Sequence, residues 1–200
     1  MANNQQHDDQ FGWSVAISGT TAIVGAKNED TGGSNAGAAY IFERNGDGTW
    51  NATETQKILA SDAAASDGFG WSVAISGATA IVGAYGEDPD DVSAAGSAYI
   101  FEKVDGAWGN EVVGQTYRKE TKKIQSFDKA QNDFFGWSVA ISGTTAIVGA
   151  RYEDPNDVSL AGSAYIFEAG TIQQPSTTPT LKAPATVTLD GTTLLIENNM

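Results

Sequence analysis

The chain contains one long segment three times. The sequence FGWSVAISGTTAIVGA begins at Phe11 and again at Phe135, and FGWSVAISGATAIVGA begins at Phe69. Each copy continues into an acidic loop and then into an aromatic segment, AGAAYIFE in the first copy and AGSAYIFE in the other two. The starts at 11, 69 and 135 lie 58 and then 66 residues apart, and the extra residues of the second interval fall between Trp108 and Ile124. Self-similarity at such a period is the signature of an array of supersecondary units, so we expect a repeat protein.

Each repeat is predicted to form four short strands. In residues 11–18, Phe, Trp, Val and Ile alternate with Gly, Ser and Ala, which is the period of a strand, and the small face would let a neighbouring sheet approach closely. A Ser-Gly turn leads into the strand 21–26. The segment 38–42 is apolar on both faces, so it must be covered on both sides. The turn 45–48 precedes 49–59, whose polar character suits an outer strand, and four such strands describe a propeller blade.

The predicted fold is therefore all-β, with three four-stranded antiparallel repeats as β-propeller-type blades in a partial or oligomer-completed propeller, plus a C-terminal β-hairpin. The hairpin is predicted from two alternating runs around Asp190-Gly191. It could supply the missing outer strand of the third blade, dock on a partner chain or form an independent appendage. The expected parts are a polar N-terminal tail, three blades, a Pro/Thr/Ser linker and the hairpin, at 1–10, 11–68, 69–134, 135–170, 171–182 and 183–200.

Three blades pose a physical problem, because propellers close with four to eight. An unclosed array exposes the apolar faces of its terminal blades, which favours association. Two chains would make a six-bladed ring with the commonest symmetry, so we expect a homo-oligomer. The alternatives are that the chain is a fragment of a longer array, or that its blades stack in another assembly.

Composition excludes several classes of function. The chain of 200 residues has 25 acidic and 11 basic side chains and a net charge of −14, which argues against nucleic acid and anionic membranes as partners. It has no cysteine, so disulfides and thiolate sites are excluded, and its one histidine, His7, cannot form a multi-histidine metal site. The sequence has no apolar run long enough for membrane insertion, and residues 1–10 do not resemble a signal peptide.

The repeated motifs resemble those of a known family. Phe-Gly-x-Ser-Val-Ala, Ile-Val-Gly-Ala and Gly-Ser-Ala-Tyr-Ile-Phe, over about residues 9–168, are similar to the FG-GAP repeat of integrin α-subunit propellers and of many bacterial surface proteins. The resemblance implies one propeller blade per repeat, a role in adhesion or interaction rather than catalysis, and an extracellular, cell-surface or virion location. Two features depart from the family. The integrin propeller has seven blades, and its calcium loop between the first two strands is replaced here by 18–21, 76–79 and 142–145, which contain no carboxylate.

Carboxylates cluster instead in the loops after the second strand of each repeat. Such clusters suit a hard cation, so Ca²⁺ is a possible cofactor, although the same residues are also ordinary turn formers. The weak candidate ligands in these loops are Glu87, Asp88, Asp90, Asp91, Glu153, Asp154 and Asp157, with Asn28-Glu29-Asp30 as the first-repeat counterpart. A second weak candidate set, Glu43, Asn45, Asp47 and Glu54, has nearly the ligand spacing of an EF-hand loop, although a simple hairpin turn also explains it.

Catalysis is not expected. A Ser-His-Asp site would need His7, which lies in the polar tail, and carboxylates that recur in every repeat do not indicate a single active site. Trp13, Trp71 and Trp137 share one strand position, which predicts core packing. Trp50 and Trp108 begin outer strands and are the better candidates for a ligand surface. The basic run 117–123 is a further candidate contact for an acidic partner or for another copy of the chain.

The sequence therefore predicts a non-enzymatic binding or adhesion module whose blades contact a protein or glycan partner. The alternative is a structural building block of a larger extracellular or virion assembly, formed by self-association of its blades. A hydrolase domain is the third hypothesis, and it would require one asymmetric carboxylate cluster in a deep pocket.

Overall fold

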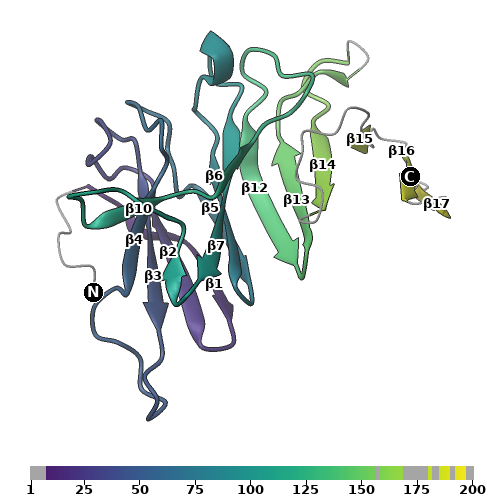
Figure 1. The fold of residues 1–200 in the computed structure, drawn as a ribbon. Helices are drawn as coiled ribbons and strands as arrows, with labels where there is room; N and C mark the ends of the chain where they lie inside the picture. Colours follow the sequence, from purple (N-terminus) through teal and green to yellow (C-terminus); the bar gives the residue numbers. More distant parts are fainter. Residues whose placement is uncertain (1–7, 156–157, 169–179, 182–184, 190–191, 197–200) are drawn as a thin grey trace.

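The computed structural model describes residues 8–155 and 158–168, together with the backbone of 180–181, 185–189 and 192–196. Over these residues the predicted all-β fold is confirmed: each repeat forms a sheet of its own, and the three sheets stand side by side in chain order (Figure 1). The antiparallel core of each sheet comprises three strands of the repeat, which are β1 (Phe11–Ser18), β2 (Thr21–Ala26), β3 (Ala38–Glu43); β5 (Ser72–Ser76), β6 (Thr79–Ala84), β7 (Ser97–Val104); and β12 (Phe135–Ser142), β13 (Thr145–Ala150), β14 (Ser163–Glu168).

A fourth, outer strand completes each sheet. It is β4 (Gln56–Leu59) in the first blade, β11 (Lys122–Ile124) in the second and β15 (Thr180–Leu181) in the third. The last strand precedes the C-terminal hairpin, so the third blade takes its outer strand from the segment before the hairpin. The hairpin strands, β16 (Ala185–Leu189) and β17 (Thr192–Ile196), pair with each other. The remaining regular segments of the second repeat are β8 (Ala107–Trp108), which pairs with β7, and the short 3-10 turn η1 (Pro89–Asp91).

Neighbouring blades pack through their inner strands, since β1 contacts β5 and β5 contacts β12. Val73 and Ile75 of β5 are buried in one cluster with Ile23 and Ile41 of the first blade. Ser14 of β1 donates its hydroxyl to the carbonyl of Gly70 at 2.7 Å, which confirms that the Gly/Ser/Ala face of the inner strand allows close approach. Each blade therefore covers one face of the preceding blade.

The extra residues of the second repeat extend the first blade. They form β9 (Asn110–Glu111) and β10 (Tyr117–Lys119), and β10 pairs with β4 in parallel. The first sheet thus has six strands, the outer two from the second repeat, where the sequence predicted four antiparallel ones. The parallel pairing follows from the chain path, because β10 arrives from the next blade and not through a hairpin.

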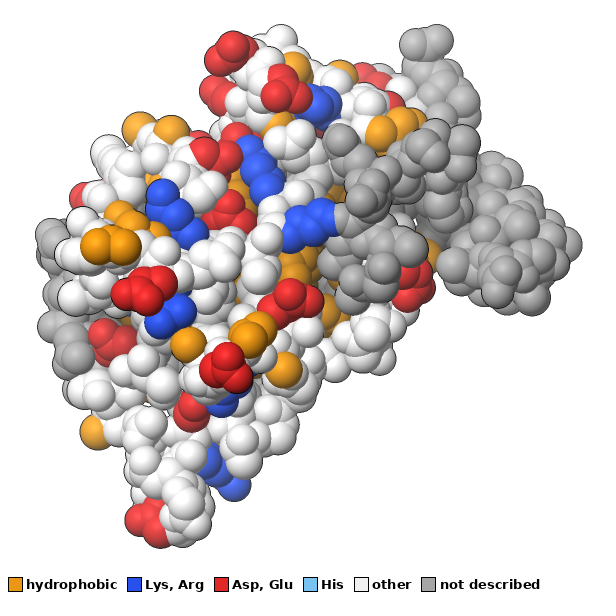
Figure 2. Space-filling view, in the orientation of Figure 1, with side chains coloured by type: hydrophobic (Ala, Val, Ile, Leu, Met, Phe, Trp, Pro, Cys, Tyr) orange, Lys and Arg blue, Asp and Glu red, His pale blue; other side chains and the backbone are white. Residues whose placement is uncertain are grey.

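The basic run 117–123 is largely engaged inside the molecule. Lys123 forms ion pairs with Asp62 at 2.6 Å and Glu87 at 2.8 Å, and Lys119 donates to the carbonyl of Ser61. In the face shown in Figure 2, basic side chains lie beside acidic ones over much of the surface.

In the described part of the chain, no helix has the length and apolar character that spanning a membrane requires.

Candidate functional site

A β-bulge at the start of β1 and of β12 decides where their tryptophans lie. The register shifts between Phe11 and Ser14 and again between Phe135 and Ser138, and the glycine after each phenylalanine has a positive φ, +93° at Gly12. Only glycine adopts this conformation without strain. The bulge interrupts the alternation, so the phenylalanine and the tryptophan no longer share one face.

The prediction that these tryptophans pack in the core is wrong. Trp13 is 50% exposed, and Trp71 and Trp137 are partly exposed. The phenylalanines take the buried place instead: Phe69 and Phe135 are fully buried, each edge-on against a tyrosine of the same blade.

The three indoles form a continuous row across the three blades. The ring centroids of Trp13 and Trp71 are 4.9 Å apart, and those of Trp71 and Trp137 are 4.7 Å apart. The ring centroid of Tyr85 lies 4.4 Å from that of Trp71 and 5.2 Å from that of Trp137. We call this the aromatic row, and its members are Trp13, Trp71, Trp137, Tyr85, Phe134 and Tyr152.

Two cations lie over the ends of the aromatic row. The Lys27 ammonium is 4.6 Å from the ring centroid of Trp13 and 5.3 Å from that of Trp71, and burial lowers its pKa. The Arg151 guanidinium is 4.5 Å from the ring centroid of Trp137. Such cation–π contacts hold the cations in place while leaving their outer donors available.

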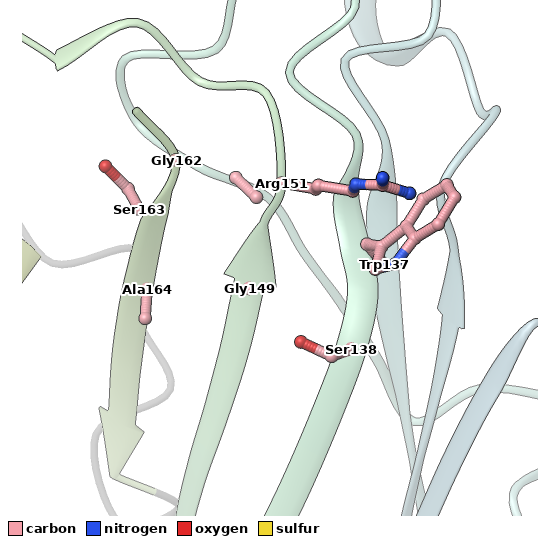
Figure 3. Close-up of a pocket in the computed structure, with 8 residues that line it drawn as sticks. Trp137, Ser138, Gly149, Arg151, Gly162, Ser163 and Ala164 are labelled. Carbon is pink, nitrogen blue, oxygen red and sulfur yellow. The ribbon is translucent and has the colours of Figure 1, made fainter. Parts of the chain in front are cut away.

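A pocket of about 440 Å³ opens beside Trp137 on the third blade. Figure 3 shows Arg151 reaching across to the Trp137 indole from the end of β13, with the Ser138 side chain directed toward β13. The pocket is lined by Trp137, Ser138, Gly149, Ala150, Arg151, Gly162, Ser163 and Ala164.

A buried aspartate precedes each inner strand, and the sequence reasoning missed it. Asp9, Asp67 and Asp133 each stand two residues before the phenylalanine and are at most 5% exposed. The carboxylates of Asp67 and Asp133 each accept a backbone N–H from the residue three positions earlier, at 2.7 and 2.6 Å. Burial raises the pKa of both groups, to about 6 for Asp67. The recurrence of Asp at one repeat position was the signal that could have found them.

The glutamate of each acidic loop is buried. Glu29 accepts from Lys57 at 2.7 Å and from the hydroxyl of Thr31 at 2.6 Å. Glu87 accepts from Ser97 at 2.5 Å as well as from Lys123, and Ser163 donates to Glu153. Lys57 and Lys123 occupy the same position of the outer strand, opposite the tyrosine of the third strand, and Thr180 has that register position in β15.

The aspartates of the same loops are exposed and stabilise the loop backbone. Asp30, Asp88 and Asp154 accept backbone N–H groups from five or six residues further along the chain. Asp90 pairs with Lys129 at 2.9 Å, Asp91 lies in η1, and Asp157 is outside the described residues.

The second candidate set is not brought together around one point. Glu43 accepts from Lys103 at 2.7 Å and from the Trp108 indole at 2.9 Å; burial alone would raise its pKa, but these contacts lower it. Asn45 and Asp47 bond to Thr49 within their own turn. In the described ranges, no three His, Cys, Asp or Glu side chains are grouped to hold a metal ion, and calcium binding stays a prediction.

Trp108 is not the exposed ligand residue that its place at an outer strand predicted. It is 1% exposed because it packs in the core between the first two blades and donates to Glu43. Trp50 is half-buried beneath Arg44, whose guanidinium lies 4.9 Å from its ring centroid. His7 lies outside the described residues.

Comparison with known proteins agrees with the repeats seen in the fold. No curated protein matches the chain. The FG-GAP repeat family matches residues 1–42, 52–101 and 119–167, so the matched segments cover all three blades and most of the chain. Such repeats are typical of β-propeller-type modules and of extracellular proteins. On this match and on the three blades, the chain belongs to the FG-GAP repeat family.

Proposed function

We propose that the chain is a non-enzymatic binding module and that the aromatic row, with Lys27 and Arg151, is the surface that meets its partner. The observation that carries the proposal is the unbroken series of partly exposed indoles, 4.9 and 4.7 Å apart, across three blades. Rigid aromatic side chains and Arg dominate binding energy at interfaces, because they present large contact areas and lose little conformational entropy.

Two features of this surface indicate the chemistry of its partner. Indole faces bind apolar side chains and the C–H faces of sugars alike, and Lys27 and Arg151 place two cations beside them in a chain of net charge −14. We therefore propose a protein or glycan that carries carboxylates beside an apolar surface. Because FG-GAP repeats are typical of extracellular proteins, we place this interaction at a cell surface or on a virion.

A role without catalysis fits the use that the molecule makes of its carboxylates. Glu29 and Glu87 are occupied by lysines and hydroxyl donors, and Asp67 and Asp133 accept backbone N–H groups. A group held in such contacts has a structural task, and the same task recurs in successive blades.

The proposal is tested with arrays of acidic peptides and acidic glycans, using the wild-type chain, Lys27→Gln and Trp71→Leu. Trp71 is the middle indole of the row, and Lys27 lies over Trp71 and Trp13. We expect the wild type to bind a defined subset of one array and each variant to bind at least about tenfold more weakly, as for a residue that contributes about 1.4 kcal/mol or more.

Trp50→Leu is the matched control, because Trp50 is also a half-buried indole under a cation but lies outside the row. Circular dichroism checks that each variant is folded. A wild type that binds nothing on either array contradicts the binding module. Equal binding by the wild type, Lys27→Gln and Trp71→Leu contradicts the assignment to the aromatic row and its cations.

A further inference from the structure

The contact between neighbouring blades is built from the same pieces at both junctions within the described residues. At the first, the N–H of Phe69 donates to the carbonyl of Ala36 at 2.8 Å, and the Ser14 hydroxyl donates to the carbonyl of Gly70 at 2.7 Å. At the second, Phe135 donates to Ala95 at 2.8 Å, and Ser72 donates to Gly136 at 2.8 Å. We call the Phe-Gly pair the plug and the receiving surface of the preceding blade the socket.

Two glycines make each socket possible. A Cβ on Gly25 would lie 2.1 Å from the carbonyl oxygen of Gly70, and one on Gly37 would lie 2.0 Å from that of Phe69. The second socket repeats this with Gly83 and Gly96, at 2.0 and 2.1 Å from the next plug. These distances are far below a van der Waals contact, so the plug requires glycine at both positions.

The third blade has the same socket, and no plug from the described residues occupies it. Ser138, Gly149 and Gly162 stand where Ser14, Gly25 and Gly37 stand in the first, and all three line the 440 Å³ pocket (Figure 3). Of the described atoms, a Cβ on Gly149 would approach only Ser138 of its own blade closely. The described part of the chain therefore supplies no atoms to the space that a plug fills at the other two junctions.

The first blade has the matching plug, also without a socket among the described residues. Gly12 has a φ of +93°, close to the +87° of Gly70 and Gly136. No described atom lies within 4 Å of the position that a Cβ on Gly12 would take. The Phe11 ring already lies edge-on to Tyr40 at 5.5 Å, as Phe69 lies to a tyrosine at 5.4 Å. The plug is thus preformed.

Among the described residues, the apolar surfaces around plug and socket are buried at the two internal junctions and exposed at the two ends. Val15 and Ile17 of the first blade are 68% and 64% exposed, whereas their counterparts Val73 and Ile75 are 9% and 8% exposed. On the third blade Ile147 is 36% exposed, whereas its counterpart in the second blade is fully buried. At the two internal junctions, the face that corresponds to the exposed face of the first blade packs against the face that corresponds to the exposed face of the third blade.

The aromatic row supplies an independent sign of the same gap. The residue after the second strand bridges two indoles at each internal junction: Lys27 lies over Trp13 and Trp71, and Tyr85 lies against Trp71 and Trp137. Arg151 has this position in the third blade, and among the described indoles it lies over Trp137 alone. The next indole in the series would be a Trp13.

We propose that two copies of the chain join head to tail, with Phe11-Gly12 of each inserted into the Ser138/Gly149/Gly162 socket of the other. Both ends of both copies are then covered by a contact that the chain already forms twice within itself. A two-fold pair of this kind closes a ring of six blades, within the range in which propellers close. This inference goes beyond the binding role and does not depend on it.

The test is the mass in solution of the wild type and of two end variants, by sedimentation velocity and light scattering. Gly149→Ala places a methyl group in the socket, where only the rotatable hydroxyl of Ser138 must give way. Ile17→Lys puts a charge on the exposed face beside the plug. We expect a wild-type dimer of twice 20.9 kDa, and a dissociation constant raised at least 100-fold in each variant.

The matched controls are Gly46→Ala, at an open turn, and Val113→Lys, at a 91% exposed position, and both residues lie outside the plug and the socket. Both controls should dimerise as the wild type does. Mixing the two end variants leaves one intact socket and one intact plug, so a heterodimer should form although neither variant dimerises alone.

Three outcomes overturn the proposal: a wild type that stays a monomer, dimerisation that neither end variant weakens, or end variants that fail to pair when mixed. Circular dichroism separates lost association from lost folding, and Ile17→Lys keeps the test valid if Gly149→Ala does not fold. Neither substitution touches Lys27 or Trp71, so failure here leaves the binding proposal standing.

Discussion

Asp67 shows how single residues at the blade junctions respond to pH. Its carboxyl is 4% exposed, and burial, together with the charges of Glu87, Asp62 and Asp88, raises its pKa to about 6. At pH values between the unfolded pKa of about 4 and this folded pKa, the folded state binds the proton more tightly than the unfolded state does. The contribution of Asp67 to stability is therefore greatest at low pH and falls as the pH rises through this window.

We expect Asp67→Asn to remove that fall. The amide oxygen can still accept the N–H of Ala64, so the loop keeps its hydrogen bond while the buried charge is lost. Relative to the variant, the wild type should lose about 2 kcal/mol of unfolding free energy between pH 4 and pH 7. Urea denaturation at several pH values measures this. Asp105→Asn, at an exposed turn, is the control, and parallel pH profiles of wild type and Asp67→Asn would refute the prediction.

Residue positions were predictable only where alternation holds without interruption. The close approach of Ser14 to Gly70 follows from the small face of the inner strand. The exposure of Trp13 does not, because a bulge at Gly12 changes which face the side chain takes, and a bulge leaves no period in the sequence. Trp108 is buried because it packs against the first blade and donates to Glu43 there, and the sequence does not specify this contact between blades.

Among the elements, β10 is the one that ties two repeats together. It belongs to the second repeat but pairs with β4 of the first through the register Tyr117–Lys57, Arg118–Ile58 and Lys119–Leu59. Glu120 accepts the backbone N–H of Ser61 at 2.9 Å, and Asn110 donates to the carbonyl of Glu120 at 2.7 Å. The insertion is thus a brace along the outer edge of the first blade.

Deletion of residues 112–119 tests the brace. It restores the spacing of the first repeat between Trp108 and Ile124, so the second blade keeps its outer strand β11. We expect the chain to fold and to lose about 3 kcal/mol of unfolding free energy, at about 1 kcal/mol for each ladder hydrogen bond. The midpoint of urea denaturation measures the change. Val113→Ser, in the same segment but 91% exposed, should leave it unaltered; a deletion variant as stable as the wild type would show that β10 adds nothing.

The strands that repeat were predictable because local pattern specifies them. The period of two and the Ser-Gly turn are present in each copy, and the structure has β1 with β2 and β12 with β13 in the same register. The partner of β10 was not predictable, since a three-residue polar strand can pair with any open edge and only the tertiary path decides which.

At the scale of the whole molecule, the open ends make stability depend on concentration. If each end is covered by a second copy, association adds to the free energy of unfolding by mass action. We expect the Tm of the wild type to rise by about 3 °C for each tenfold increase in protein concentration. The Tm of Gly149→Ala should be independent of concentration in the same scanning calorimetry, and a wild-type Tm that does not move contradicts the expectation.

The count of three blades and the open ends followed from the sequence, because the repeats can be counted. The chemistry of the ends did not, since the sequence around Gly149 and Gly162 does not show that both glycines line one pocket beside Trp137. The pocket on the third blade is recognised as a socket only by comparison with the filled sockets of the first two blades.

The aromatic row also has an optical consequence. Three indole chromophores spaced 4.9 and 4.7 Å apart, with planes tilted by 45° and 51°, share their electronic excitation, and their circular dichroism is that of a coupled set and not of isolated tryptophans. The sign and size of the resulting couplet report the angle and spacing between successive blades. The circular dichroism of the row therefore reports the blade geometry directly. Closing a ring would add one more coupling between indoles at each new junction.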